Sequence, residues 1–152
     1  MSVDLGALID AAASHALATG LFERVNTHEP KSAPGYGLTA AVWVQNVASI
    51  QGSGLDSASA RVELSVRIFT KMLSEPQDMI DPHMIQATNT LINAYAGDFD
   101  LGVTGVRAVD LLGMTGLPLR AEAGYVNQDG TLYRVMTVFL PIIVNDVWSE
   151  VA

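Results

Sequence analysis

The chain has 152 residues, of which 49% are hydrophobic and 16% charged, and its formal net charge is −8 at pH 7. This length predicts a single domain, residues 1–152, with a core of its own. The acidity disfavours binding to the phosphate backbone of nucleic acids, and a chain without cysteine has no disulfides, thiolate nucleophiles or cysteine-ligated metals.

The charged fraction lies below the ~25% of an average globular protein, while the apolar fraction is high. This balance predicts that part of the surface faces another subunit. The N-terminal residues lack the charge and apolar pattern of a signal peptide, so we expect none. The longest apolar run, residues 135–144, is shorter than the ~20 residues of a membrane span, so we expect no membrane partner.

Residues 3–19 form the first predicted element, a helix. Its apolar residues recur at helical spacing, Ser2 can act as N-cap, and Gly20 stands where a C-terminal glycine belongs. A short strand over residues 22–27 follows.

The segment of residues 29–37 is polar and unusually constrained. Pro30 and Pro34 each fix φ at about −65° and remove a backbone donor. The segment leads directly into a strand that contains Trp43. This rigidity indicates a contact role, because it lowers the ordering entropy that an interface costs; an ordinary connection is the alternative.

Two long strands are expected at residues 39–50 and 60–72, joined into a hairpin by a flexible turn. The second strand alternates strictly between apolar and polar residues. One of its faces is therefore core, and the other, with Arg61, Arg67 and Phe69, is either wet or paired.

A second helix begins at Asp81, a good N-cap, and ends at Gly97. Three strands follow it, the last two of them forming a hairpin, at residues 105–112, 119–127 and 131–144. Beyond Val135 the last strand is apolar on both faces. We expect both faces to be covered, by a helix of the same subunit or by a neighbouring subunit.

The predicted element order is α-β-β-β-α-β-β-β, without an internal repeat or a domain linker. Runs of strands separated by single helices predict an α+β fold. In this fold a mostly antiparallel β-sheet is packed with two long α-helices.

The side chains offer no catalytic or metal-binding constellation. The histidines are isolated from one another and from ligand-type partners: His15, His28 and His83. The nearest carboxylate pairs, Asp78 with Asp81 and Asp98 with Asp100, flank the second helix and are explained by its boundaries. We therefore expect no enzymatic activity, no cofactor and no metal.

Residues suited to contacts with other proteins are better represented than catalytic or metal-binding residues. Trp, Tyr and Arg are the usual anchors of protein interfaces, and Trp148 lies near the end of the chain. The alternative for each aromatic residue is a place in the core. The candidate interface residues are Pro30, Lys31, Pro34, Tyr36, Trp43, Arg61, Arg67, Phe69, Pro141 and Trp148.

A series of short motifs, in a fixed order, covers nearly the whole chain. Among them are Glu29-Pro-Lys-Ser-Ala-Pro-Gly-x-Gly37, Ala41-Val-Trp-Val-Gln45, Val109-Asp-Leu-Leu-Gly113 and Pro141-Ile-Ile-Val-Asn-Asp-Val-Trp148. Each is weak alone, and the ordered set resembles the tail terminator proteins of long-tailed (siphovirus) phages that infect actinobacteria.

The resemblance implies a structural role in a virion. Tail terminators form a ring, usually a homohexamer, on the head-proximal end of the tail tube, and are assembled in the host cytoplasm. The ring stops polymerisation of the tube and presents a surface to the head-proximal connector protein. The implied partners are other copies of the chain, the tail tube protein and this connector, and DNA passes through the lumen without specific binding.

Three alternatives remain open. The chain can be another head–tail connector or tail-completion protein of a phage, or a monomeric connector or assembly chaperone that binds one partner transiently. It can also be a small enzyme with an unrecognised site, for which Asp78, Asp98 and His83 are the groups to substitute.

Overall fold

The computed structural model describes residues 4–22, 24–27, 38–51, 57–71, 80–98, 100–128 and 130–149. Within these residues the helices and strands are α1 (Leu5–Ala18), β1 (Arg24–Asn26), β2 (Thr39–Gln51), β3 (Ser57–Lys71), α2 (Ile80–Ala96), β4 (Val106–Val109), β5 (Arg120–Gln128) and β6 (Thr131–Ser149). The predicted contact residues Pro30, Lys31, Pro34 and Tyr36 lie outside the described residues, as do Ser2, His28 and Asp78.

The strands form one sheet in the order β1-β2-β3-β6-β4, and β5 also pairs with β6. The predicted hairpins are present, because β2 pairs antiparallel with β3 and β5 pairs antiparallel with β6. β1 lies parallel to β2 at the edge. One edge of β6 serves two partners in turn, with β5 opposite residues 131–139 and β4 opposite residues 142–144.

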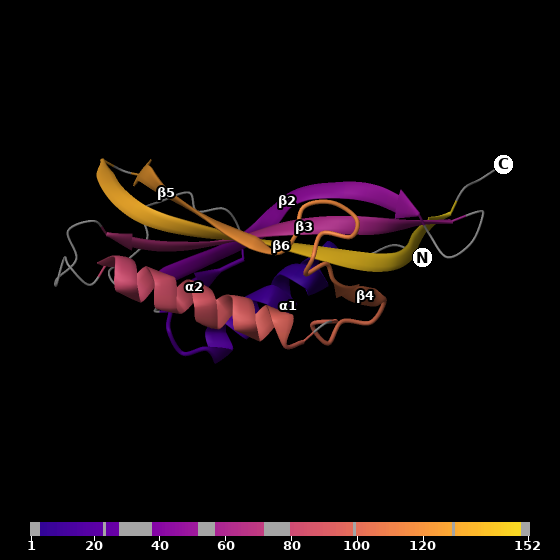
Figure 1. Ribbon diagram of the computed structural model, residues 1–152, viewed down its shortest axis with the longest axis horizontal. Coiled ribbons are helices and arrows are strands. Elements are labelled where there is room, and N and C mark those ends of the chain that lie inside the picture. Colours follow the sequence, from indigo (N-terminus) through magenta and orange to yellow (C-terminus); the bar gives the residue numbers. More distant parts are fainter. Residues whose placement is uncertain are drawn as a thin grey trace.

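The prediction of a sheet packed with two long helices is wrong. The protein is mostly β, and its six described strands hold about twice as many residues as its two helices. β6 has 19 residues, whereas α1 has 14 and α2 has 17. A strand residue also advances ~3.3 Å against ~1.5 Å in a helix, so the strands set the length of the molecule (Figure 1).

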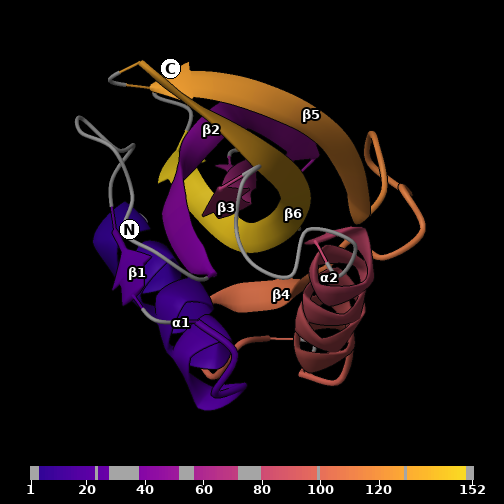
Figure 2. The same ribbon diagram turned by 90° about the vertical axis from the view of Figure 1, so that its left-hand side faces the viewer.

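The sheet curls into a half-barrel, with both helices on its outer side (Figure 2). Its register shifts between Val44 and Asn46 in β2, and again where β3 passes from Ala58 to Ala60 opposite β6. Such irregularities bend a strand and increase its twist. The curl is therefore a property of long, bulged strands, and it lets the sheet cover part of its own second face.

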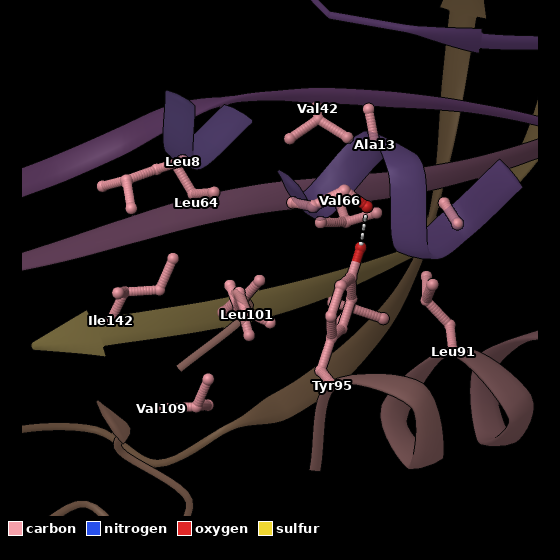
Figure 3. Packing of buried hydrophobic residues seen from close by; sticks show 14 of the residues in the cluster. Leu8, Ala13, Val42, Leu64, Val66, Leu91, Tyr95, Leu101, Val109 and Ile142 are labelled. Carbon is pink, nitrogen blue, oxygen red and sulfur yellow. Dashed lines mark hydrogen bonds between the residues drawn. The ribbon is translucent and has the colours of Figure 1, made fainter. Parts of the chain in front are cut away.

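The helices and the sheet enclose the larger core cluster between them (Figure 3). Leu8 and Ala12 of α1 and Leu91 and Tyr95 of α2 are all buried in this cluster. The Tyr95 hydroxyl donates to the Ala12 carbonyl oxygen at 2.8 Å, which ties the two helices together. Burial raises the pKa of Tyr95, so the phenol stays a neutral donor.

The helix α1 begins and ends where local chemistry dictates. Its N-cap is Asp4, two residues later than the expected Ser2, and the Asp4 carboxylate accepts from the Ala7 amide at 3.2 Å. Gly20, just past the C-cap, has φ 71°, as predicted for a terminating glycine. Neither helix of the described chain is both long and apolar enough to cross a membrane.

We predict that Leu64→Ala lowers the free energy of unfolding by about 2–5 kcal/mol, because Leu64 of β3 is fully buried in the larger cluster. The same substitution at Leu17, which is 57% exposed on α1, is the control and changes stability by less than about 0.5 kcal/mol. Urea unfolding followed by circular dichroism measures both. Equal losses in the two variants would contradict the assignment of the core.

Candidate functional site

The inner face of the curled sheet carries four charged side chains in contact with one another: Arg61, Glu63, Asp110 and Arg120, here called the charged cluster. Glu63 Oε2 accepts from Arg61 Nη1 at 3.3 Å and from Arg120 Nη1 at 3.4 Å. Arg61 Nε lies 3.9 Å from Asp110 Oδ2. Two positive and two negative groups are thus balanced in a site where Arg61, Glu63 and Asp110 are buried.

Asp110 organises the segment that follows β4, residues 110–119. Its carboxylate accepts from the Met114 amide at 2.8 Å and from the Thr115 amide and hydroxyl at 2.9 and 2.7 Å. Burial on its own would raise the pKa of Asp110, but these hydrogen bonds and the Arg61 charge outweigh it and hold the pKa below its usual value. Asp110 is therefore an ionised anchor rather than a general acid.

Arg61 holds the other end of the same segment. It donates through Nε to Thr115 Oγ1 at 3.3 Å and through Nη2 to the Leu117 carbonyl oxygen. Arg120 donates to the Pro118 carbonyl oxygen at 3.3 Å, and its guanidinium stacks 4.2 Å from the centre of the Phe139 ring. The charged cluster therefore attaches residues 110–119 to the sheet from both ends.

Two glycines make this course of the backbone possible. Gly113 has φ 77°, and a Cβ there would lie 2.6 Å from the Gly116 carbonyl oxygen. Gly116 packs on the Arg61 guanidinium, and a Cβ at this position would lie 2.8 Å from Arg61 Cζ.

The segment carries large apolar side chains that face solvent. Leu112 and Met114 are each 85% exposed, and Leu111 and Leu117 are also exposed. An exposed group of apolar side chains on an ordered support is typical of an interaction site. We call residues 110–119 the apolar loop. Beside it, Arg107, Leu112, Met114 and Ile143 help to line a pocket of about 330 Å³.

Pro141 shows why β6 can pass from β5 to β4 at this point. Within the sheet it lies opposite Glu63 of β3, and its carbonyl oxygen accepts from the Asp110 amide at 2.9 Å, on the other edge. In an antiparallel strand the N–H and C=O of one residue face the same neighbour. The missing N–H of Pro141 is therefore on the edge where β5 has ended and β4 begins, so the pairing with β3 loses no hydrogen bond.

The structure places the predicted contact residues in two kinds of surroundings. Arg61, Phe69 and Pro141 are buried, and Phe69 belongs to a second apolar cluster on the inner face with Tyr133 and Val135. The face of β3 that carries Arg61 and Phe69 was predicted to be either exposed to water or paired with other side chains. In the structure its side chains are paired. The cover of β6, left open between its own subunit and a neighbour, is supplied largely by the chain itself.

Trp43, Arg67 and Trp148 are more accessible. The Arg67 guanidinium lies 5.2 Å from the centre of the Trp43 ring and donates through Nε to Thr137 Oγ1 at 2.9 Å. Trp148 is 39% exposed and lies within β6 rather than after it. Their roles at an interface stay predictions.

The described residues contain no group of three or more His, Asp or Glu that could hold a metal ion. His15 is partly buried, with Nδ1 2.7 Å from the Ala11 carbonyl oxygen and Nε2 2.9 Å from Asp98 Oδ2. Asp100 accepts from the Gly102 amide at 2.9 Å. Asp98 and Asp100 thus fasten the turn after α2, which agrees with the helix-boundary interpretation.

The sequence interpretation missed the apolar loop, because Leu111 and Leu112 were assigned to a strand that ends at Val109 in the structure. A local signal was present. Asp110 is followed at three and six residues by Gly113 and Gly116, a pattern typical of a turn stabilised by a carboxylate. Apolar residues without helical or strand periodicity in such a segment indicate an exposed loop.

Comparison with known proteins finds a similarity of fold. A chain from the virion of a native gene transfer agent (GTA) particle matches with a TM-score of 0.52 and 16% sequence identity, over 91% of this chain and 95% of that chain. The two chains share a fold. No family model matches this chain, and no curated protein does.

We predict that Gly116→Ala loosens the apolar loop. The added methyl group displaces the Arg61 guanidinium from its buried partners, which costs about 1–3 kcal/mol of unfolding free energy. Gly124→Ala in β5 is the control, because a Cβ there meets only Val135 Cγ2 at an ordinary 3.6 Å. Proteolysis between residues 110 and 119 that accelerates no more in Gly116→Ala than in Gly124→Ala would argue against the packing described.

We predict a pH-dependent difference between the wild type and Asp110→Asn. Because the folded pKa of Asp110 is lowered, its contribution to stability is complete above the unfolded pKa of about 3.9 and is lost as the pH falls through the folded pKa. Asp110→Asn is therefore less stable by about 1–3 kcal/mol at pH 7. Urea unfolding should show the two stabilities converging below about pH 4; a constant difference would refute the anchor role.

Proposed function

We propose that this chain is a structural protein of a phage-like virion and that it acts there as a tail terminator. The observation that carries the proposal is the fold shared with a chain of a virion particle over nearly the whole length of both. The ordered sequence motifs that resemble tail terminators support the finer assignment. Enzymatic activity is not part of this role.

In this role several copies form a ring, as a homohexamer, on the head-proximal end of the tail tube. The ring ends tube polymerisation and offers its other side to the head-proximal connector protein. The net charge of −8 suits a ring through which DNA passes without binding. The low charged fraction and the exposed apolar loop supply surface for contacts between subunits or with the tube.

The contact residues predicted from sequence belong to this proposal. The segment of residues 29–37 and the accessible Trp148 are assigned to contacts with a neighbouring subunit or the tube. Trp43, stacked on Arg67, offers an aromatic anchor of the kind that interfaces use.

Labelling on particles tests the proposal. In particles purified from the source that encodes this chain, gold-labelled antibody against the chain should mark one position, where the tail meets the head. Preparations made without the chain should contain tail tubes of uncontrolled length that are not joined to heads. Label along the whole tube or on the capsid would refute the terminator assignment, and particles free of the chain would refute the virion role.

A further inference from the structure

The apolar loop is matched by a second feature elsewhere on the chain. An open groove of about 580 Å³ lies between α1 and α2; its exposed lining surface is mostly apolar, although five of its seven residues carry a polar group. We call it the interhelical groove; its lining is Ser14, His15, Ala18, Thr19, Thr90, Asn93 and Ala94. In both ribbon views the apolar loop lies above the helices, toward β5, so the two features are on different parts of the surface (Figures 1 and 2).

The two features carry opposite charges at their rims. Arg107 is exposed beside Leu112 and Met114, and its hydrogen bonds go to the neutral acceptors Asn145 Oδ1 at 2.6 Å and Ser59 Oγ at 3.4 Å. Arg120, the first residue after the same loop, is also partly exposed. The one carboxylate within the loop, that of Asp110, is buried and faces Arg61.

The groove has an acidic rim. Asp10 is exposed on α1 one turn before Ser14 and two turns before Ala18, so the three residues lie on one stripe of the helix. The Asp98 carboxylate, which follows α2 and lies 2.9 Å from His15 of the groove lining, is partly exposed. Among the described residues that line the groove there is no Lys or Arg.

We infer that the apolar loop of one copy of this chain docks in the interhelical groove of a second copy. Leu112 and Met114 fill the groove, and Arg107 approaches the carboxylates of Asp10 and Asp98. A chain of net charge −8 repels its own copies in general, whereas the approach of Arg107 to these carboxylates is electrostatically favourable. The charged cluster orders the loop before contact, which reduces the entropy lost on docking.

The geometry of this contact has a consequence for assembly. Because loop and groove are different surfaces, each copy uses one to bind a copy ahead and the other to bind a copy behind. Such head-to-tail contacts give a closed ring when the rotation between subunits closes. The inference relies on the proposed function only for the expectation that copies of the chain associate.

A mixing experiment with complementary variants tests the docking. Leu112→Asp with Met114→Asp disables the loop, and Ala94→Arg disables the groove. Each variant alone should be at least tenfold weaker in self-association than the wild type in sedimentation equilibrium. Mixed in equal amounts they should form heterodimers that grow no further, because one retains a working groove and the other a working loop.

Matched controls separate docking from general effects of charge and folding. Val47→Asp with Leu132→Asp adds the same charges at exposed apolar positions away from the loop, and Asn89→Arg adds the same charge to α2 outside the groove. Both should associate as the wild type does. Far-ultraviolet circular dichroism and thermal unfolding identify any variant that fails to fold, for which Leu112→Ser and Ala94→Gln serve as milder replacements.

Several outcomes overturn the inference: a wild type that stays monomeric at millimolar concentration, loop variants that associate unchanged, or a mixture that remains monomeric. A ring on tails that survives the loop variants would refute the docking while leaving the virion role intact. Complementary heterodimers from a chain absent from particles would support the docking and refute the virion role.

Discussion

The pairing of β3 with β6 is the constraint on which the rest of the molecule depends. These strands of 15 and 19 residues run side by side through the middle of the sheet and are covered on both faces. The two helices cover only the outer face. The inner face is covered by the curl of the sheet and by the apolar loop, and this second cover is where the charged side chains lie.

Burying charges on an inner face requires that they be matched. Arg61 and Glu63 alternate with core residues of β3, and both are buried, so their charges are largely removed from water. Asp110, the first residue of the apolar loop, matches Arg61, and Arg120, directly after the loop, matches Glu63. Such clusters add little net stability over an apolar core, but removing one member is costly, and the loop is thereby fixed in one position.

Sequence periodicity was sufficient to locate most elements. The alternation in β3, the caps of α1 and the hairpin formed by β5 and β6 depend on neighbours in the chain, and these were predicted within a few residues. The curl was not predictable in this way. It depends on register shifts between distant strands and on the two partners that share one edge of β6.

The candidate site, too, could be predicted from the sequence only in part. The alternation indicated that Arg61 is either wet or paired, but its partner Asp110 lies 49 positions further along the chain, and the two meet only after the sheet has formed. The exposure of Leu112 and Met114 likewise depends on β4 ending at Val109. The next amide, that of Asp110, donates to the Pro141 carbonyl oxygen. Local propensity favoured a longer strand, and tertiary contacts ended it.

Disulfide cross-linking tests the central claim, that loop and groove meet between copies, most directly. The chain has no cysteine, so Leu112→Cys and Ala94→Cys provide a pair without background. A disulfide forms only when the two Cα atoms come within about 7 Å. The account predicts that the double variant forms covalent oligomers under mild oxidation, whereas neither single variant is cross-linked between copies. Efficient cross-linking of Leu112→Cys alone, or none in the double variant, would contradict it.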